Sequence, residues 1–244
     1  MNSTKLLYME DMQMLTCNAT VLDVQKENDK DVVVLDQTCF YPQGGGQPYD
    51  QGIIESSDEK KLHVEEVRFI DGQVKHIGTF TGDGAFNVND QITCYVESAR
   101  RALHARLHSA GHIVDMAVTA LGLDWTPGKG YHFPDGPYVE YATNTEITDK
   151  EKLKNDIETK CNAFIAEARE TSIIFMPKEQ MHTVCHHVPD YIPEGKPARV
   201  MMYGDFGVPC GGTHVANLRD VGAITIRKIK GTNGTIQIAY DIVR

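Results

Sequence analysis

The sequence lacks several features that would place it in a particular class of protein. None of its six cysteines forms a Cys-x2-Cys pair, and they are scattered through apolar segments, so no disulfide framework is indicated. No window approaches the roughly 18 uninterrupted apolar residues that a membrane-spanning helix requires. Residues 1–11 contain no apolar signal core. We therefore expect a protein of the reducing cytoplasm that has no membrane partner.

Signatures of nucleotide binding and of peptide hydrolysis are missing as well. The three glycines at residues 44–46 are not followed by Gly-Lys-Ser/Thr, so they do not form a phosphate loop. Residues 75–78, Lys-His-Ile-Gly, resemble part of the class I synthetase signature but lack its second histidine. We interpret them as part of a strand, and we find no ATP site. The glutamate of the His-Glu-x-x-His zinc proteases is also absent, which argues against a peptidase.

The negative charge of the chain is concentrated in its first part. The formal net charge of −10 disfavours a nucleic-acid partner when it is taken alone. Residues 1–92 contain 7 Lys/Arg against 16 Asp/Glu, and residues 93–244 contain 17 against 18. The second part has two basic clusters that either hold a few phosphates or are simply solvated. They are Arg100, Arg101 and Arg106, and Arg227, Lys228 and Lys230.

The hydrophobic pattern changes to a helical period near residue 97. Before it, short β-branched or alternating runs are separated by turn signals such as Asp71-Gly72, which predicts a small β-barrel. After it, apolar residues recur every three or four positions up to Gly122, and a capping box at residues 148–151 predicts a second helix. We therefore predict an α+β fold. A β-barrel domain with a glycine-rich loop would cover residues 1–92, and an α/β domain would cover residues 93–244.

Four potential metal ligands stand in two pairs about a hundred residues apart. His108 and His112 are four residues apart in the predicted helix, so both lie on the same helical face. Cys210 and His214 have the same separation in a loop, Cys-Gly-Gly-Thr-His, whose glycines allow the chain to turn both side chains inward. This ligand set suits a tetrahedral zinc ion. The alternative is an ordinary helix and an unrelated glycine turn.

Two other groups of histidines are weaker candidates. His104 continues the stripe of His108 and His112, where contact with substrate or solvent is the better interpretation. Residues 185–187, Cys-His-His, are adjacent in sequence. Adjacent side chains point in different directions and rarely share a metal.

Three motifs together resemble a known family. His-Ser-Ala-Gly-His at residues 108–112 and Cys-Gly-Gly-Thr-His-Val at 210–215 resemble the editing domain shared by alanyl-tRNA and threonyl-tRNA synthetases. Phe-Tyr-Pro-Gln-Gly-Gly-Gly-Gln at residues 40–47 points to the alanyl branch. Without a synthetase core beside these motifs, the chain resembles the free-standing alanyl-tRNA editing proteins of the AlaX type. That resemblance implies a translation-protein-like β-barrel followed by a synthetase-type editing domain.

The resemblance also implies a function and a set of residues that perform it. Members of the family bind zinc and hydrolyse mischarged tRNA for alanine, chiefly Ser-tRNA and in some members Gly-tRNA. Gln47 would line the aminoacyl pocket, and Thr38 would recognise the seryl hydroxyl. The implied zinc ligands are His108, His112, Cys210 and His214.

Two departures from the family pattern affect these expectations. Gly111 replaces a residue that is more often bulkier, which is expected to loosen the helix locally. The basic segment at residues 228–231 is thinner than in many relatives, which is expected to weaken tRNA binding. Two other functions stay open, namely a non-catalytic tRNA-binding module with a structural zinc and a metallohydrolase of a different ester. The motifs do not indicate an oligomeric state.

Overall fold

A computed structural model describes residues 3–82, 84–145, 147–232 and 234–243. The chain divides into two compact units, which we treat separately. The first contains Met1–Gly44 and Pro48–Ala102, and the second contains Gly45–Gln47 and Leu103–Arg244. No helix in the described ranges is both long enough and apolar enough to cross a membrane.

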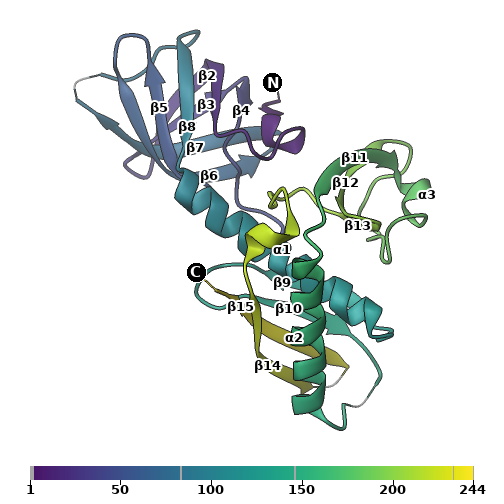
Figure 1. Cartoon of the computed structure of the whole chain (residues 1–244). Coiled ribbons are helices and arrows are strands. Elements are labelled where there is room, and N and C mark those ends of the chain that lie inside the picture. The colour runs from purple at the N-terminus through teal and green to yellow at the C-terminus, as the bar shows by residue number, and fades with distance from the viewer. Residues whose placement is uncertain (1–2, 83, 146, 233, 244) are drawn as a thin grey trace. The chain divides into compact units, whose positions relative to one another are not determined.

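The first unit is built around a closed barrel of six strands (Figure 1). The predicted β-barrel is therefore confirmed. Its interior is filled by buried apolar residues from all six strands, among them Val33, Leu35 and Ile54. In order around the barrel the strands are β2 (Thr16–Glu27), β3 (Lys30–Leu35), β7 (Gln73–Thr81), β6 (Lys61–Ile70), β5 (Gly52–Ser56) and β8 (Gln91–Val96).

The extent of this unit differs from the predicted domain boundary between residues 92 and 93. Strand β8 pairs with both β2 and β5 and closes the barrel. The barrel therefore continues past residue 92, and the compact unit ends at Ala102. The first unit also contains two short strands, β1 (Lys5–Leu6) and β4 (Gln37–Thr38), which pair in parallel. The 3-10 helix η1 (Leu7–Met9) directly follows β1.

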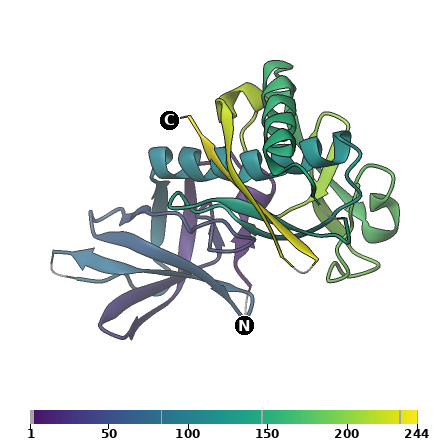
Figure 2. The ribbon, with the colours of Figure 1, turned by 90° about the horizontal axis from the view of Figure 1, so that it is seen from below.

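The second unit contains an antiparallel sheet in the order β14 (Ile224–Thr232), β15 (Thr235–Ile242), β10 (Tyr138–Ala142) and β9 (Thr126–Tyr131). Helices α1 (Ser98–Ala120) and α2 (Lys150–Ala166) pack against it. The Tyr240 hydroxyl of β15 donates to the Leu107 carbonyl of α1 at 2.9 Å. Figure 2 shows α1 lying across the yellow strands β14 and β15. Helix and sheet together confirm the predicted α+β class.

A smaller sheet and a capped helix complete the second unit. Strands β11 (Thr171–Pro177), β12 (Pro197–Tyr203) and β13 (Phe206–Pro209) form the sheet, with α3 (Lys178–Met181) next to it and the 3-10 helix η2 (Leu218–Val221) later in the chain. Helix α2 begins one residue later than the predicted capping box implies. Its N-cap is Asp149, whose carboxylate accepts from the Lys152 backbone N–H at 2.9 Å. A carboxylate at this position also interacts favourably with the helix dipole.

Candidate metal centre

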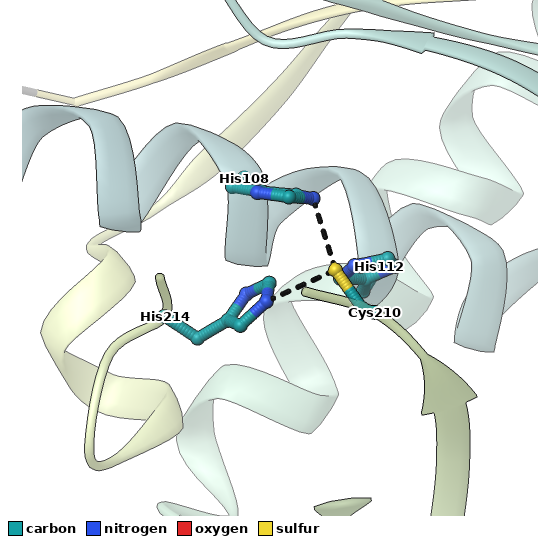
Figure 3. A group of neighbouring side chains, drawn as sticks. All are labelled: His108, His112, Cys210 and His214. Carbon is teal, nitrogen blue, oxygen red and sulfur yellow. Dashed lines mark hydrogen bonds between the residues drawn. The ribbon is translucent and has the colours of Figure 1, made fainter. Parts of the chain in front are cut away.

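Four side chains of the second unit converge on one point beside α1 (Figure 3). His108 and His112 project from the helix, and Cys210 and His214 come from the loop that follows β13. One ligand atom from each residue lies within 4.8 Å of the others. The Cys210 sulfur is 3.5 Å from Nε2 of His108 and 3.3 Å from Nε2 of His214. This cluster could hold a metal ion.

The spacing of these atoms is compatible with zinc. At Zn–N and Zn–S distances of about 2.1 and 2.3 Å, the ligands of a tetrahedral ion lie about 3.5 Å apart. The two distances from Cys210 agree with that value. In addition, Nε2 of His112 is buried without a hydrogen-bond partner among the described residues. A bound metal would satisfy this nitrogen, whereas a buried polar atom without a partner is otherwise costly.

Hydrogen bonds orient two of the four ligands. The Thr213 backbone N–H donates to Oε1 of Gln47 at 3.0 Å, which identifies that atom as the amide oxygen. His108 Nδ1 lies 2.8 Å from the same oxygen and must therefore carry a hydrogen, so the lone pair of Nε2 faces Cys210. Nδ1 of His214 lies 2.8 Å from the Tyr203 hydroxyl. Histidines that bind metals usually have their second nitrogen held in this way.

Burial keeps the three imidazoles neutral at pH 7. It lowers the pKa of His112 to about 4, and together with the neighbouring histidines it lowers the pKa values of His108 and His214 far below the usual range. Burial also raises the pKa of the Cys210 thiol. A neutral imidazole can offer its lone pair to a metal, while the thiol loses its proton when the metal binds.

Gln47 is fully buried, and it contacts His108 at Nδ1, the ring nitrogen that does not face Cys210. Its amide nitrogen donates to Oγ1 of Thr213 at 2.8 Å, and its oxygen accepts from His108 and from the Thr213 backbone. These contacts indicate a group that orients a metal ligand. The family resemblance implies that Gln47 lines the aminoacyl pocket, and that role remains a prediction.

We expect Gln47→Leu to weaken metal binding roughly 10- to 100-fold, because His108 would lose the acceptor that fixes its tautomer. Competition with a chromophoric chelator measures this affinity. Gln43→Leu is the matched control, since Gln43 is an exposed glutamine of the same loop. Equal affinities in the two variants would exclude the orienting role.

Thr38 lies in β4 of the first unit and is fully buried. Nδ1 of His76 faces the Val33 carbonyl at 3.1 Å, so Nε2 is the accepting nitrogen of that ring. The Thr38 hydroxyl therefore donates to Nε2 at 2.8 Å, and its oxygen accepts from the Phe40 N–H at 3.1 Å. Recognition of a seryl hydroxyl by Thr38 remains a prediction. His76 is a neutral barrel residue whose pKa is lowered to about 4 by burial.

Sequence motifs do not single out several residues that surround the ligands. Ser109 accepts from the Val215 N–H at 3.1 Å and lies 3.4 Å from Nδ1 of His214. Arg199 donates to the carbonyls of Cys210 and Gly212, both at 2.8 Å, and so holds the ligand loop. The one sequence signal for Arg199 is a charge within a strand that is otherwise apolar.

The remaining histidine candidates lie outside the cluster. Among the described residues, the group that could hold a metal includes neither His104 nor any of residues 185–187. His104 is buried on α1, and Cys185 belongs to a small core with Met181 and Val200. Helix α1 also runs without a break through Gly111, and the expected local loosening of the helix remains a prediction.

Comparisons with known proteins place these features in a family context. Residues 3–100 match the family described as tRNA synthetases class II (A). Residues 198–237 match the threonyl and alanyl tRNA synthetase second additional domain, and they include Cys210 and His214.

Individual relatives cover most of the chain. The alanyl-tRNA editing protein AlaX-M of Methanosarcina barkeri is 27% identical over 239 residues, which are 93% of each protein. AlaX-L of Pyrococcus horikoshii is 30% identical over 90% of this chain and 53% of its own length. An alanine–tRNA ligase of Methanothrix thermoacetophila is 34% identical over 86% of this chain and 22% of the ligase.

The chain thus spans between about a fifth and a half of the length of the first curated relatives that it matches. The matches nevertheless extend over both compact units and agree with the three sequence motifs. The chain is therefore a relative of the alanyl-tRNA editing proteins of the AlaX type and of the alanine–tRNA ligases.

Proposed function

We propose that this protein acts in the cytoplasm as a hydrolase that deacylates tRNA for alanine when it carries serine and, as a second substrate, glycine. The observation that carries the proposal is the convergence of α1 and the Cys-Gly-Gly-Thr-His loop on one metal-competent cluster. Its similarity to proteins named as alanyl-tRNA editing proteins supports the same activity. An aminoacyl ester is an activated acyl group, so the barrier to be lowered is modest.

The metal in this proposal is zinc, held by His108, His112, Cys210 and His214. Zinc could polarise the ester carbonyl, lower the pKa of a water molecule or orient the substrate. Four protein ligands close a tetrahedral site, so catalysis requires one ligand that can be displaced. His108 and His214 are each held through a hydrogen bond at Nδ1, so the displaceable ligand is to be sought between His112 and Cys210.

A decisive test offers the purified protein tRNA for alanine charged with serine, glycine or alanine, alongside metal analysis. We expect rapid release of serine, slower release of glycine and little release of alanine, with the activity lost after chelation and restored by zinc. Tight tRNA binding without turnover would instead select the non-catalytic module with a structural zinc. Equal turnover of seryl esters with and without the tRNA body would select a general metallohydrolase.

Thr38→Val tests the proposed recognition of the seryl hydroxyl. A site that hydrogen-bonds a hydroxyl can discriminate far more strongly than one that must merely exclude it. We expect kcat/KM for Ser-tRNA to fall by at least a hundredfold. The same change leaves Nε2 of His76 without its donor, which costs about 1–3 kcal/mol of stability. Urea unfolding measures that loss. If the fall in kcat/KM is no larger than the loss of folded protein accounts for, Thr38 has a packing role alone.

The outer face of the four-stranded sheet supports an RNA partner. Directly paired residues share a face of a sheet, and one cross-strand row consists of Lys228, Ala239, Tyr138 and Tyr131. The rings of Tyr131 and Tyr138 are nearly parallel at 5.4 Å, and Phe133 stacks on Tyr131 at 4.6 Å.

This row combines the two contacts that unpaired RNA requires. A base stacked on Tyr138 would lie over the small Ala239 side chain, and its phosphates would reach the exposed Lys228 and Lys230. Three acidic groups near this row already have partners, and one of them, Asp135, accepts from the Tyr131 hydroxyl at 3.0 Å. Glu140 accepts from Gln237, and Asp241 pairs with Arg227 at 3.1 Å.

Replacing Lys228 and Lys230 together by glutamine is expected to weaken tRNA binding about tenfold at low salt. The slope of log K against log salt should fall by about 1.4–1.8, the value for two lost phosphate contacts. Filter binding over a range of salt concentrations measures both quantities. Lys150→Gln with Lys196→Gln, which changes two exposed lysines of the same unit, is the control. Identical slopes in the two double variants would place the RNA elsewhere.

A further inference from the structure

His132 packs directly against the metal cluster although it is not one of its four ligands. It follows β9 and is almost completely buried. Its ring stacks on that of His108 with centroids 4.4 Å apart and an interplanar angle of 21°. Its backbone N–H donates to the Gly46 carbonyl at 2.8 Å. The neighbour of Gly46 is Gln47, which bonds to the edge of the same His108 ring at Nδ1.

A hydrogen-bond relay fixes the orientation of the His132 ring. The Tyr240 hydroxyl donates its one hydrogen to the Leu107 carbonyl at 2.9 Å. It must therefore accept from Nδ1 of His132, which lies 2.6 Å away. Leu107 immediately precedes His108 on α1. The relay thus ties His132 to the helical turn that carries the metal ligand.

Two glycines provide the space that this ring occupies. A Cβ atom added to Gly111 would lie 2.5 Å from Cε1 of His132, and one added to Gly130 would lie 2.5 Å from its Nε2. Gly111 lies in the interior of α1, where glycine is less favourable than alanine. The close approach of His132 gives a physical reason for glycine at this position.

We propose that His132 is a positioning residue of the metal centre that holds the His108 ring in the plane required for ligation, and that Gly111 and Gly130 are glycine in order to admit it. This inference rests on the metal centre of the proposed function. It adds a residue that neither the ligand motif nor the glycine-rich motif contains. Stacking restrains the tilt of the His108 ring, whereas Gln47 restrains its rotation through Nδ1.

Cobalt substitution tests the proposal without any tRNA. We expect His132→Ala to weaken Co²⁺ binding about 10- to 100-fold and to change the visible d–d absorption, which reports ligand geometry. His132→Phe keeps a stacked ring and loses the Tyr240 bond, so its affinity should lie between those of His132→Ala and the unchanged protein. An unaltered affinity and spectrum in His132→Ala would overturn the proposal. Circular dichroism of both variants identifies any loss of folding. If His132→Ala does not fold, the Co²⁺ affinity and spectrum of His132→Phe alone test the proposal.

A double-mutant cycle examines the role of Gly111. Gly111→Ala should by itself reproduce the weakened Co²⁺ binding, because its methyl group displaces the ring. In the His132→Ala background the same change should have a much smaller effect, because only the 3.1 Å approach of the added Cβ to the Tyr240 hydroxyl remains. Additive losses would overturn the proposed coupling. In β9, Gly130→Ala should weaken binding, whereas Gly128→Ala, whose Cβ would meet Glu140 and not His132, should not.

These readouts separate the inference from the proposed function. If the unchanged protein binds Co²⁺ and fails to deacylate Ser-tRNA, the proposed reaction is wrong while the cobalt test of His132 still applies. If the unchanged protein deacylates Ser-tRNA and His132→Ala binds Co²⁺ normally, only the role of His132 is wrong.

Discussion

Cys210→Ala is expected to abolish metal binding and deacylation of Ser-tRNA together. The Cys210 sulfur lies within 3.5 Å of Nε2 of both His108 and His214. Its removal therefore leaves only three of the four proposed metal ligands. Zinc sites of four ligands are worth roughly 10–16 kcal/mol, or about 3 kcal/mol for each ligand, which is more than a hundredfold in affinity. Metal content after dialysis and the rate of ester hydrolysis measure the two losses.

Cys185→Ala is the matched control for this experiment. Cys185 is a buried cysteine of the same unit that packs with Met181 and Val200 and belongs to no metal-competent group among the described residues. It should retain both metal and activity. Full hydrolysis of Ser-tRNA by a metal-free Cys210→Ala protein would contradict the proposed function.

The second large effect concerns the stability of the barrel unit. Asp50→Ala is expected to lower the free energy of unfolding by about 3–5 kcal/mol, because it leaves the Arg101 guanidinium buried without its counter-ion. Asp50 is fully buried and Arg101 is 4% exposed. Arg101 donates to both carboxylate oxygens and to the Cys39 carbonyl at 2.7 Å. The Asp50 carboxylate also accepts from the Tyr41 N–H at 2.7 Å.

Urea unfolding of the full chain measures this effect, and two comparisons interpret it. Asp50→Ala combined with Arg101→Met removes both charges and should be less destabilised than Asp50→Ala alone. Asp156→Ala breaks an exposed pair with Lys152 on α2, which should cost no more than about 0.5 kcal/mol. Equal losses in Asp50→Ala and Asp156→Ala would show that burial of the Arg101 pair has no energetic consequence.

Arg101 also illustrates a limit of prediction from composition. Its position in the sequence beside Arg100 and Arg106 predicts a phosphate-binding or solvated cluster. In the structure Arg101 is an internal ion-pair residue, and Arg106 donates to the Val221 carbonyl at 2.9 Å. Successive helical residues point about 100° apart. Which of them faces the interior depends on packing partners that are distant in sequence.

Local patterns in the amino-acid sequence are sufficient to predict two features of this protein. Alternating runs indicated barrel strands, and the four-residue separation of His108 and His112 placed both on one face of α1, because the helical period depends only on the local backbone. Which distant groups contact that face depends on how the chain packs in three dimensions. Gln47, His132 and the loop from Cys210 to His214 reach it through long-range packing, and side-chain contacts across such separations have no local period from which they could be predicted.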